Sequence, residues 1–409
     1  MHCSDCHGYI RYAGLNPFQV SGTQIRRSFT FRRINAGNPL YVRNLMACVA
    51  ILFVTACALA DDPPQPAEPL LSASRTVIVA SSKAEAFAGN ESVGKIPSGS
   101  VLRYSDQNGP WLLIPRYGGW LNREDVVALE RAVEYFSGII AREPSPQAFH
   151  HRGIAQMSVG AYDAAIDDFT RAITQGLKDP GVYINRGVAR QRRGDLPAAV
   201  EDFSSAIQLD PNSARAYDNR AGALAELGQF DASLADSNEA LRISPTFAEA
   251  FNNRGVTWRM KGDDQQALAD YTQAIELYES YAAAYANRGY IHKRLGDFPL
   301  AISDYEKAIE LDPTSHGACN DLAWLLATSA DDSVRNGTRA VELATRACEL
   351  TRNRNADYLD TLAAALAETG DFTAAAAKAE AALALAPETA RGSIQQRLAL
   401  YQAQQPYRE

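Results

Sequence analysis

Cysteine and histidine side chains at the start of the sequence have the spacing of a haem-attachment motif. Cys3 and Cys6 are followed by His7, the C-x-x-C-H pattern in which two thioethers hold the haem and the histidine ligates its iron. The motif precedes an apolar stretch typical of an export signal, so no folded domain would surround a haem there. We interpret it as an upstream extension, or as the product of a mis-assigned start codon, and expect no cofactor.

No other set of side chains has the spacing of a catalytic motif. The adjacent His150 and His151 would point in different directions from one helix, so they cannot easily share a metal ion. The sequence contains no glycine-rich phosphate loop and no H-E-x-x-H run. The net charge of −8 does not indicate nucleic-acid binding. We expect a non-enzymatic protein without a metal site, with an enzyme or redox protein as the alternative class.

The elements that precede any folded domain predict export. Residues 45–60 read LMACVAILFVTACALA, follow several arginines and end in Ala58-Leu59-Ala60, whose small alanines at −3 and −1 fit signal peptidase. The stretch is shorter than the roughly 20 apolar residues of a membrane-spanning helix. Cleavage after Ala60 would leave a periplasmic, envelope-associated or secreted protein.

Two alternatives to this cleavage stay open. Cys57 ends a lipobox-like Val54-Thr55-Ala56-Cys57 and could be lipidated, or the segment could be retained as an anchor. Either would associate the protein with a membrane or the cell envelope through its N-terminus. We assign residues 1–60 to an N-terminal extension with a signal peptide or anchor, and the proline-rich residues 61–71 to a linker.

Residues 72–128 predict a small β domain. The order of VGKIPSG at 93–99, NGPWL at 108–112 and GWL at 119–121 resembles bacterial SH3-like domains. The resemblance implies a barrel of five or six strands, in a family whose members often bind cell-envelope peptides or other proteins. Trp111, Tyr117 and Trp120 could form an aromatic peptide-docking surface. Because a small barrel needs large side chains to fill it, we expect the two tryptophans mostly in the core.

From residue 146 the sequence repeats every 34 residues. Apolar residues in each unit fall at i, i+3, i+4 and i+7, which predicts two amphipathic helices. A small residue at position 8 lets the two helices approach, and a glycine at position 15 ends the first helix in a left-handed conformation. The position-15 glycines are Gly160, Gly194, Gly228, Gly262, Gly296 and Gly370.

The period and these residues resemble tetratricopeptide repeats. The resemblance implies a mainly α fold, a right-handed superhelical solenoid of helix-turn-helix repeats whose first helices line a concave, partner-binding surface. We expect a capping helix or linker at 129–145, a capping helix at 390–409 and a monomer, since terminal caps cover the apolar ends. The repeats, with an insertion in the sixth, occupy 146–179, 180–213, 214–247, 248–281, 282–315, 316–355 and 356–389.

Position 6 of the first helix carries polar side chains that would line the groove. A carboxamide donates and accepts hydrogen bonds, so a ladder of asparagines could pair with the backbone of an extended peptide. Alternatively these side chains bond to neighbouring repeats or to water. The residues are His151, Asn185, Asn219, Asn253 and Asn287.

Arginine at position 7 and aspartate at position 23 recur over five repeats. We expect each arginine to lie along the helix interface and to pair with an aspartate of its own or an adjacent repeat. The arginines are Arg152, Arg186, Arg220, Arg254 and Arg288. The aspartates are Asp168, Asp202, Asp236, Asp270 and Asp304.

Basic residues near the end of the first helices indicate a positive strip at one edge of the groove, which would favour an acidic peptide. The strip includes Arg192, Arg259, Lys293 and Arg294. The sequence therefore predicts a protein–protein interaction scaffold that binds an extended peptide or partner protein in the groove. The alternative is an envelope-associated assembly factor that is anchored through its SH3-like module.

Overall fold

The computed structural model describes residues 75–89 and 91–409. The Cys3-Cys6-His7 motif, the export signal with Cys57 and the 61–71 linker lie outside the described residues. No helix in the described part combines the length and apolarity that a membrane span requires. Within the same ranges, no group of three or more histidine, cysteine, aspartate and glutamate side chains is placed to hold a metal ion.

Eight short strands and two 3-10 helices occupy the described part of the expected β domain, rather than five or six strands. They form two antiparallel sheets, with strand orders β4-β1-β8 and β3-β2-β7-β6-β5. Val77, Leu102, Leu112 and Leu121 fill the core between them. The bounds are β1 Thr76–Val79, β2 Glu85–Ala88, β3 Glu91–Lys95, β4 Val101–Arg103, β5 Asp106–Asn108, β6 Trp111–Ile114, η1 Pro115–Tyr117, β7 Gly119–Asn122, η2 Arg123–Asp125 and β8 Val126–Ala128.

Sixteen helices follow in the described chain. A single helix, α1 (Leu129–Arg142), joins the strands to seven antiparallel helix pairs, and α16 (Glu388–Gln402) covers the last pair. The first and second helix of each pair are called A and B below. The pairs are α2 Pro146–Ser158 and α3 Tyr162–Thr174; α4 Pro180–Arg193 and α5 Leu196–Leu209; α6 Ala214–Glu226 and α7 Phe230–Ile243; α8 Ala248–Lys261 and α9 Asp264–Leu277; α10 Ala282–Leu295 and α11 Phe298–Leu311; α12 His316–Thr328 and α13 Gly337–Leu350; α14 Ala356–Glu368 and α15 Phe372–Leu385.

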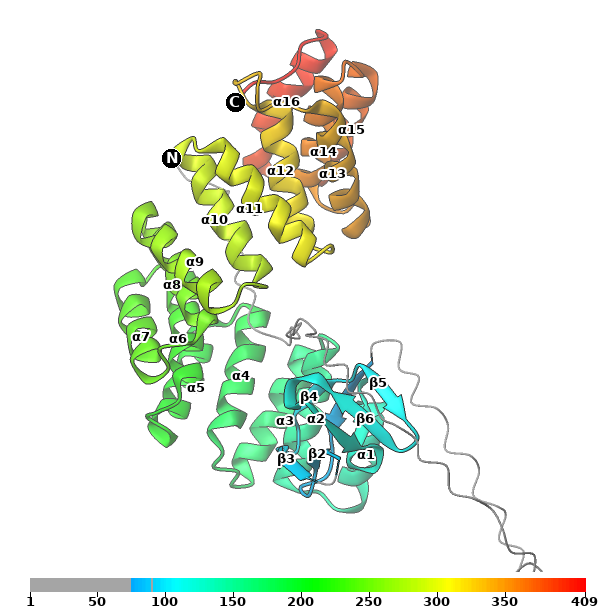
Figure 1. Cartoon of the computed structure of the whole chain (residues 1–409), viewed down its shortest axis with the longest axis vertical. Coiled ribbons are helices and arrows are strands. Elements are labelled where there is room, and N and C mark those ends of the chain that lie inside the picture. The colour runs from blue at the N-terminus through cyan, green and yellow to red at the C-terminus, as the bar shows by residue number, and fades with distance from the viewer. Residues whose placement is uncertain (1–74, 90) are drawn as a thin grey trace, which may run out of the picture.

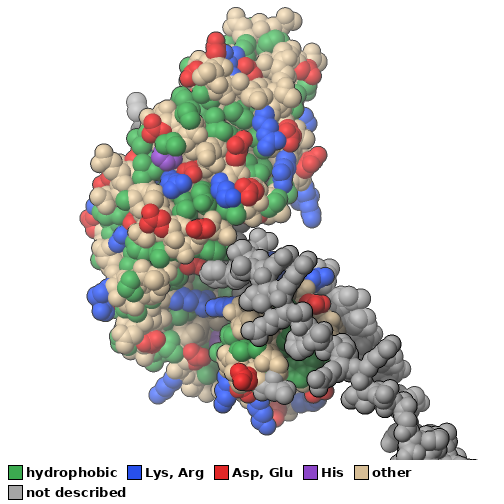
Figure 2. Space-filling view, viewed as in Figure 1, with side chains coloured by type: hydrophobic (Ala, Val, Ile, Leu, Met, Phe, Trp, Pro, Cys, Tyr) green, Lys and Arg blue, Asp and Glu red, His purple; other side chains and the backbone are tan. Residues whose placement is uncertain are grey.

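The helix pairs stack into an arc that is open on one side, with α7 on its outer side (Figure 1). A helices of adjacent repeats approach one another more closely than B helices do. Because the inner side of a curved stack is the shorter one, the A helices form the concave surface. Figure 2 shows Lys and Arg side chains interspersed with Asp and Glu along the arc. The face of the molecule in this view therefore carries charges of both signs.

Local sequence sets the ends of the repeat helices. Ser213 caps α6 by accepting a hydrogen bond from the backbone N–H of Ala216 at 3.3 Å. Gly194 ends α4 at φ +91°, a conformation that a residue with a Cβ rarely adopts. These signals make each repeat a helix pair of defined length, which keeps equivalent positions in register along the arc.

The insertion in repeat six lies between α12 and α13 and is held by Arg335. Its guanidinium donates to the backbone oxygens of Ser329 and Ala330 at 2.8 and 3.2 Å and pairs with Glu368 at 3.1 Å. Repeats six and seven share one large apolar cluster, in which Cys319 and Cys348 are buried free thiols. Burial raises the pKa of Cys348 to about 11, so the thiol stays protonated.

Candidate partner-binding groove

The asparagines at position 6 bond to the preceding repeat across the concave surface. The Asn253 side-chain nitrogen donates to both carboxylate oxygens of Asp218, each at 3.1 Å. The Asn287 nitrogen donates to the Asn252 side-chain oxygen at 2.9 Å. Both bonds join residues 35 apart, so position 6 of one repeat meets position 5 of the repeat before it. These amides hold adjacent A helices together.

One asparagine in this series lacks its bond. The equivalent place, 35 residues before Asn219, is occupied by Ile184, whose side chain has no acceptor. Asn219 is 6% exposed, and its side-chain nitrogen has no hydrogen-bond partner in the described structure. Repeat three therefore contains a buried donor without a partner on its A helix.

The β domain covers the first repeat of the groove. A Cβ added to Gly99, in the β3–β4 turn, would lie 2.9 Å from the His151 ring and 3.2 Å from Ile154. Burial, and then the neighbouring His150, lower the pKa of His151 to about 4. His150 lies 3.1 Å from the Asn185 amide nitrogen. His151 is thus enclosed by the chain itself rather than open to a partner.

A buried carboxyl group lies on α6, where it bonds to the A helix of the next repeat. Asp218 is 5% exposed, and burial raises its pKa to about 7, although the hydrogen bond from Asn253 opposes the shift. Glu249 adds to the rise and Arg215 opposes it. Asp218 is a functional candidate that the repeat pattern did not bring to attention. The signal was present in the polar residues at position 5, one residue before the asparagines.

The expected basic strip is interrupted, because one of its residues pairs with a carboxylate and another is buried. Arg294 pairs with Asp264 at 3.3 Å. Arg259 is 6% exposed and lies 5.2 Å above the Tyr290 ring, so its charge is largely enclosed between repeats four and five. Arg192 is exposed and Lys293 half-buried. The four residues do not make one continuous exposed basic surface.

Trp111 and Trp120 lie on the outer face of the five-stranded sheet, which corrects the expectation that they fill the core. Leu112 and Leu121 point inward and are fully buried, so their sequence neighbours face the other way. Trp111 is 36% exposed and packs edge-on against Phe87, with ring centroids 6.3 Å apart. Tyr117 is partly buried against the strand core.

All five expected arginine–aspartate pairs form, each within one repeat. The shortest nitrogen–oxygen distances are 2.6 Å in four repeats and 2.8 Å between Arg288 and Asp304. The pairs lie between the A and B helices and are partly buried. They fix the register of each helix pair and leave the inner surface to other positions.

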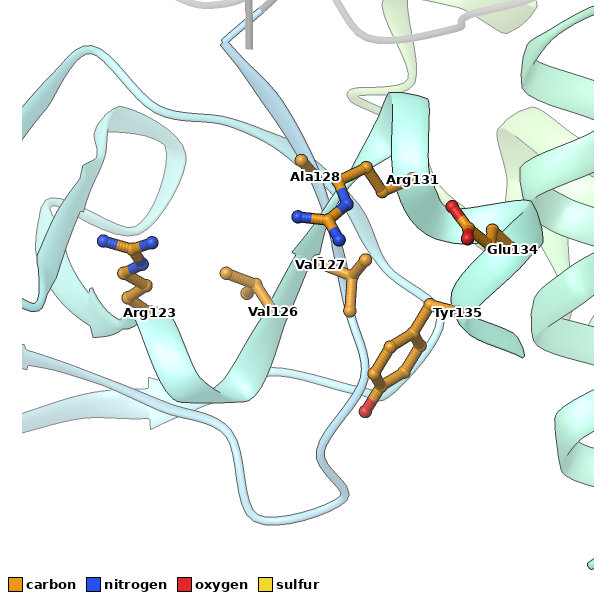
Figure 3. Close-up of a pocket in the computed structure, with 7 residues that line it drawn as sticks. All are labelled: Arg123, Val126, Val127, Ala128, Arg131, Glu134 and Tyr135. Atoms are coloured by element: carbon orange, nitrogen blue, oxygen red, sulfur yellow. The ribbon is translucent and has the colours of Figure 1, made fainter. Parts of the chain in front are cut away.

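A hollow of about 390 Å³ lies between β8 and the start of α1 (Figure 3). Val126, Val127 and Tyr135 give it an apolar wall, and Arg123 and Arg131 extend beside it. Glu134 is the only carboxylate among its lining residues. The seven residues that line this hollow include no nucleophile paired with a base.

Comparisons with known proteins agree with the helical architecture. Family models described as "Tetratricopeptide repeat" match residues 214–247 and 282–315, and one described as "TPR repeat" matches 192–228. No curated protein sequence matches the chain.

Solved structures share the fold at low sequence identity. Yeast Tom70 aligns with a TM-score of 0.52 at 17% identity, over 68% of this chain and 59% of its own. The structure titled "Crystal structure of APC/C hetero-tetramer Cut9-Hcn1" aligns with a TM-score of 0.51 at 17% identity, over 58% of this chain and 46% of that one. The chain thus spans about half the length of these proteins. The family models and the fold together show that this chain carries tetratricopeptide repeats.

Proposed function

We propose that the protein is a non-enzymatic interaction scaffold that binds an extended peptide or partner protein on the concave surface of its repeats. The observation that carries the proposal is the unsatisfied amide of Asn219. A buried polar group without a partner costs about 1–3 kcal/mol, and a peptide carbonyl would remove that cost. The side-chain amides of Asn253 and Asn287 already donate hydrogen bonds within the fold. Asn219 is therefore the asparagine of this series whose amide is left to bind a partner.

The chemistry of the partner follows from the groove residues. Asp218 is buried beside Asn253, and Arg259 is largely enclosed, so neither charge dominates the surface. The sequence predicts an acidic partner. Arg294 already pairs with Asp264, so its charge is partly neutralised, and the acidity of the partner stays a prediction. We propose backbone-directed binding of an extended segment at repeats three and four by a monomeric scaffold.

Capture of a partner by defined variants tests the proposal. Residues 61–409 would be used as bait in native extracts, as wild type and as N219A. We expect N219A to lose at least tenfold in capture while its thermal stability is unchanged or higher, because it removes an unsatisfied donor. Undiminished capture by N219A would contradict the proposed site.

The matched control is N287A. It removes a position-6 amide that bonds to Asn252, so it should lower stability by about 1 kcal/mol and leave capture intact at a temperature where it is folded. Opposite effects on stability and capture distinguish a binding asparagine from a structural one.

A second function rests on the exposed aromatic face of the β domain. We propose that this domain is SH3-like and that Phe87, Trp111 and Trp120 dock a cell-envelope component, so that the exported protein is an envelope-associated assembly factor. Cell fractionation tests this idea. Wild type should sediment with the envelope, and W111A/W120A should shift to the soluble fraction; C57S separates lipid tethering from aromatic docking.

A further inference from the structure

The last residues of the sequence fold back onto the A helices of repeats six and seven. After α16 ends, Gln404 adopts φ +56° and residues 405–409 run without regular structure. The backbone N–H of Glu409 donates to the Thr328 backbone oxygen at 2.8 Å. The Glu409 carboxylate accepts a hydrogen bond from Trp324 Nε1 at 2.9 Å. Residues 403–409 are called the return segment below.

A tilted contact between two aromatic rings provides a second attachment. The Tyr407 and Trp324 rings lie 5.9 Å apart at an interplanar angle of 44°. The guanidinium of Arg397, on α16, lies 5.4 Å from the Trp324 ring and 5.5 Å from the Tyr407 ring. Asp360 holds Arg397 in place at 2.6 Å. Trp324 and the cation of Arg397, which Asp360 holds in position, together form a receptor for an aromatic side chain such as that of Tyr407.

An ion pair makes the third attachment. Arg408 Nη2 lies 2.5 Å from Glu368 Oε2, on α14. Glu368 also pairs with Arg335 of the repeat-six insertion, so its position is fixed from the other side. The return segment is thus held by a backbone hydrogen bond, a ring–ring contact and two side-chain contacts within three consecutive residues.

These contacts use the same surface as the asparagine series. Asp360 occupies position 5 of repeat seven, the address of Asp218 and Asn252 in repeats three and four. Trp324, Thr328 and Glu368 likewise belong to A helices. The groove therefore has one covered end at repeat one, under the β domain, and a second at repeats six and seven, under the return segment.

We propose that the inner surface of repeats six and seven is a second peptide-binding site, selective for an extended segment with an aromatic residue followed two residues later by an acidic one, and that the return segment occupies it until such a partner displaces it. The proposal rests on the proposed function of the groove. The occupant shows the chemistry that the site recognises: a ring on Trp324 beside Arg397, and a carboxylate on the indole N–H.

A labelled peptide of residues 403–409, AQQPYRE with an amidated end, tests the site in the full chain. Its one carboxylate is that of Glu409. Fluorescence anisotropy would compare wild type with Y407A/E409Q, whose own segment is loosened. The tethered segment competes at an effective concentration of about millimolar, so we expect the variant to bind the peptide at least tenfold more tightly than wild type.

Controls separate this site from the rest of the groove. Adding W324A to Y407A/E409Q should abolish peptide binding, whereas adding W258A, a tryptophan on the A helix of repeat four, should not. Faster hydrogen exchange at the Glu409 amide should accompany Y407A/E409Q. Equal affinity of wild type and variant, or no binding by either, would overturn the proposal.

The result is independent of the Asn219 experiment. Peptide binding by Y407A/E409Q together with full partner capture by N219A would retain the second site and reject the site at repeat three. Loss of capture by N219A without peptide binding would do the reverse.

Discussion

Arg220 on α6 and Asp236 on α7 form a two-bond ion pair within repeat three, with Nε–Oδ2 and Nη2–Oδ1 distances of 2.6 and 2.8 Å. The remaining guanidinium nitrogen of Arg220 donates to Ser204, on the B helix of repeat two, at 3.0 Å. One arginine thus connects three helices from two repeats. Equivalent third bonds reach Thr170, Asn238 and Thr272 in neighbouring repeats.

Removing this arginine should destabilise the array strongly. R220L leaves Asp236 largely enclosed without its partner, and we expect a loss of about 3 kcal/mol in the free energy of unfolding. R220L/D236L should recover most of the loss, because an apolar pair of similar volume replaces the ion pair. Urea denaturation of R220L, D236L and R220L/D236L measures the free energy of unfolding of each variant. Additive effects of the two single substitutions would contradict a coupling between the two side chains.

Repeat six supplies the precedent for that double variant. Leu322 stands where the first five repeats have the arginine, and Leu343, three residues after the buried Ala340, stands where they have the aspartate. Both leucines are buried in the apolar cluster of repeats six and seven. The same helix interface thus carries an arginine–aspartate pair in five repeats and a pair of leucines in repeat six.

A second pairing links position 8 to position 24. A Cβ at Gly187 would lie 2.6 Å from the Phe203 ring, and repeat three, with Ala221 at position 8, has Ser237 in place of the aromatic. We expect G187A to cost about 2 kcal/mol in wild type through overpacking. In an F203S background the same change should be neutral or stabilising by up to about 1 kcal/mol, since alanine favours helix. Thermal denaturation of wild type, G187A, F203S and G187A/F203S gives the coupling free energy between the two positions.

Asp218 should make stability fall as pH rises from about 4 to about 7. The folded carboxyl keeps its proton up to about pH 7, whereas the unfolded one loses it near pH 4, so the folded state binds more protons in this window. D218N keeps an acceptor for Asn253 but cannot ionise. At pH 8 it should be more stable than wild type by on the order of a few kcal/mol, with the gap closing toward pH 4.

His151 provides the opposite trend. Its folded pKa of about 4 lies below the ordinary value of 6.5, so stability is lost as pH falls from about 6.5 toward 4. Between about pH 4 and 6.5, rising pH lowers stability through Asp218 and raises it through His151. Melting temperatures of wild type, D218N and H151Q at pH 4 to 8 resolve them; parallel curves for D218N and wild type would exclude Asp218 as the source.

The sequence pattern predicted the helix pairs and the arginine–aspartate contacts because both depend on spacing within one repeat. Bonds between repeats depend on the tilt of one repeat on the next, which the period does not specify. The Asn253–Asp218 bond and the unsatisfied Asn219 therefore required coordinates. The return segment lies outside the repeats and has no periodic signal.

Trp111 shows a different limit of sequence reasoning. The run Trp111-Leu112-Leu113-Ile114 is apolar throughout, so alternation does not say which face is inward. The register with β7 decides it: Leu112 pairs with Leu121 in the core, and Leu113 pairs with Trp120 on the other face. The two tryptophans were expected inside for their volume, but aliphatic residues and Tyr104 already fill that core.

We expect the close approach of Gly99 to His151 to hold the β domain and the first repeat together as one unit. G99V places a branched side chain against the His151 ring at a backbone φ of +83°, which valine rarely adopts. Ile78 shares an apolar cluster with Phe136 of α1, so displacement of the β domain would also expose that surface. We expect faster hydrogen exchange and proteolysis near residues 129–145 in G99V. The matched variant G109V, in the β5–β6 turn, has a similar left-handed φ of +57° but no nearby atoms, so it should leave those residues protected.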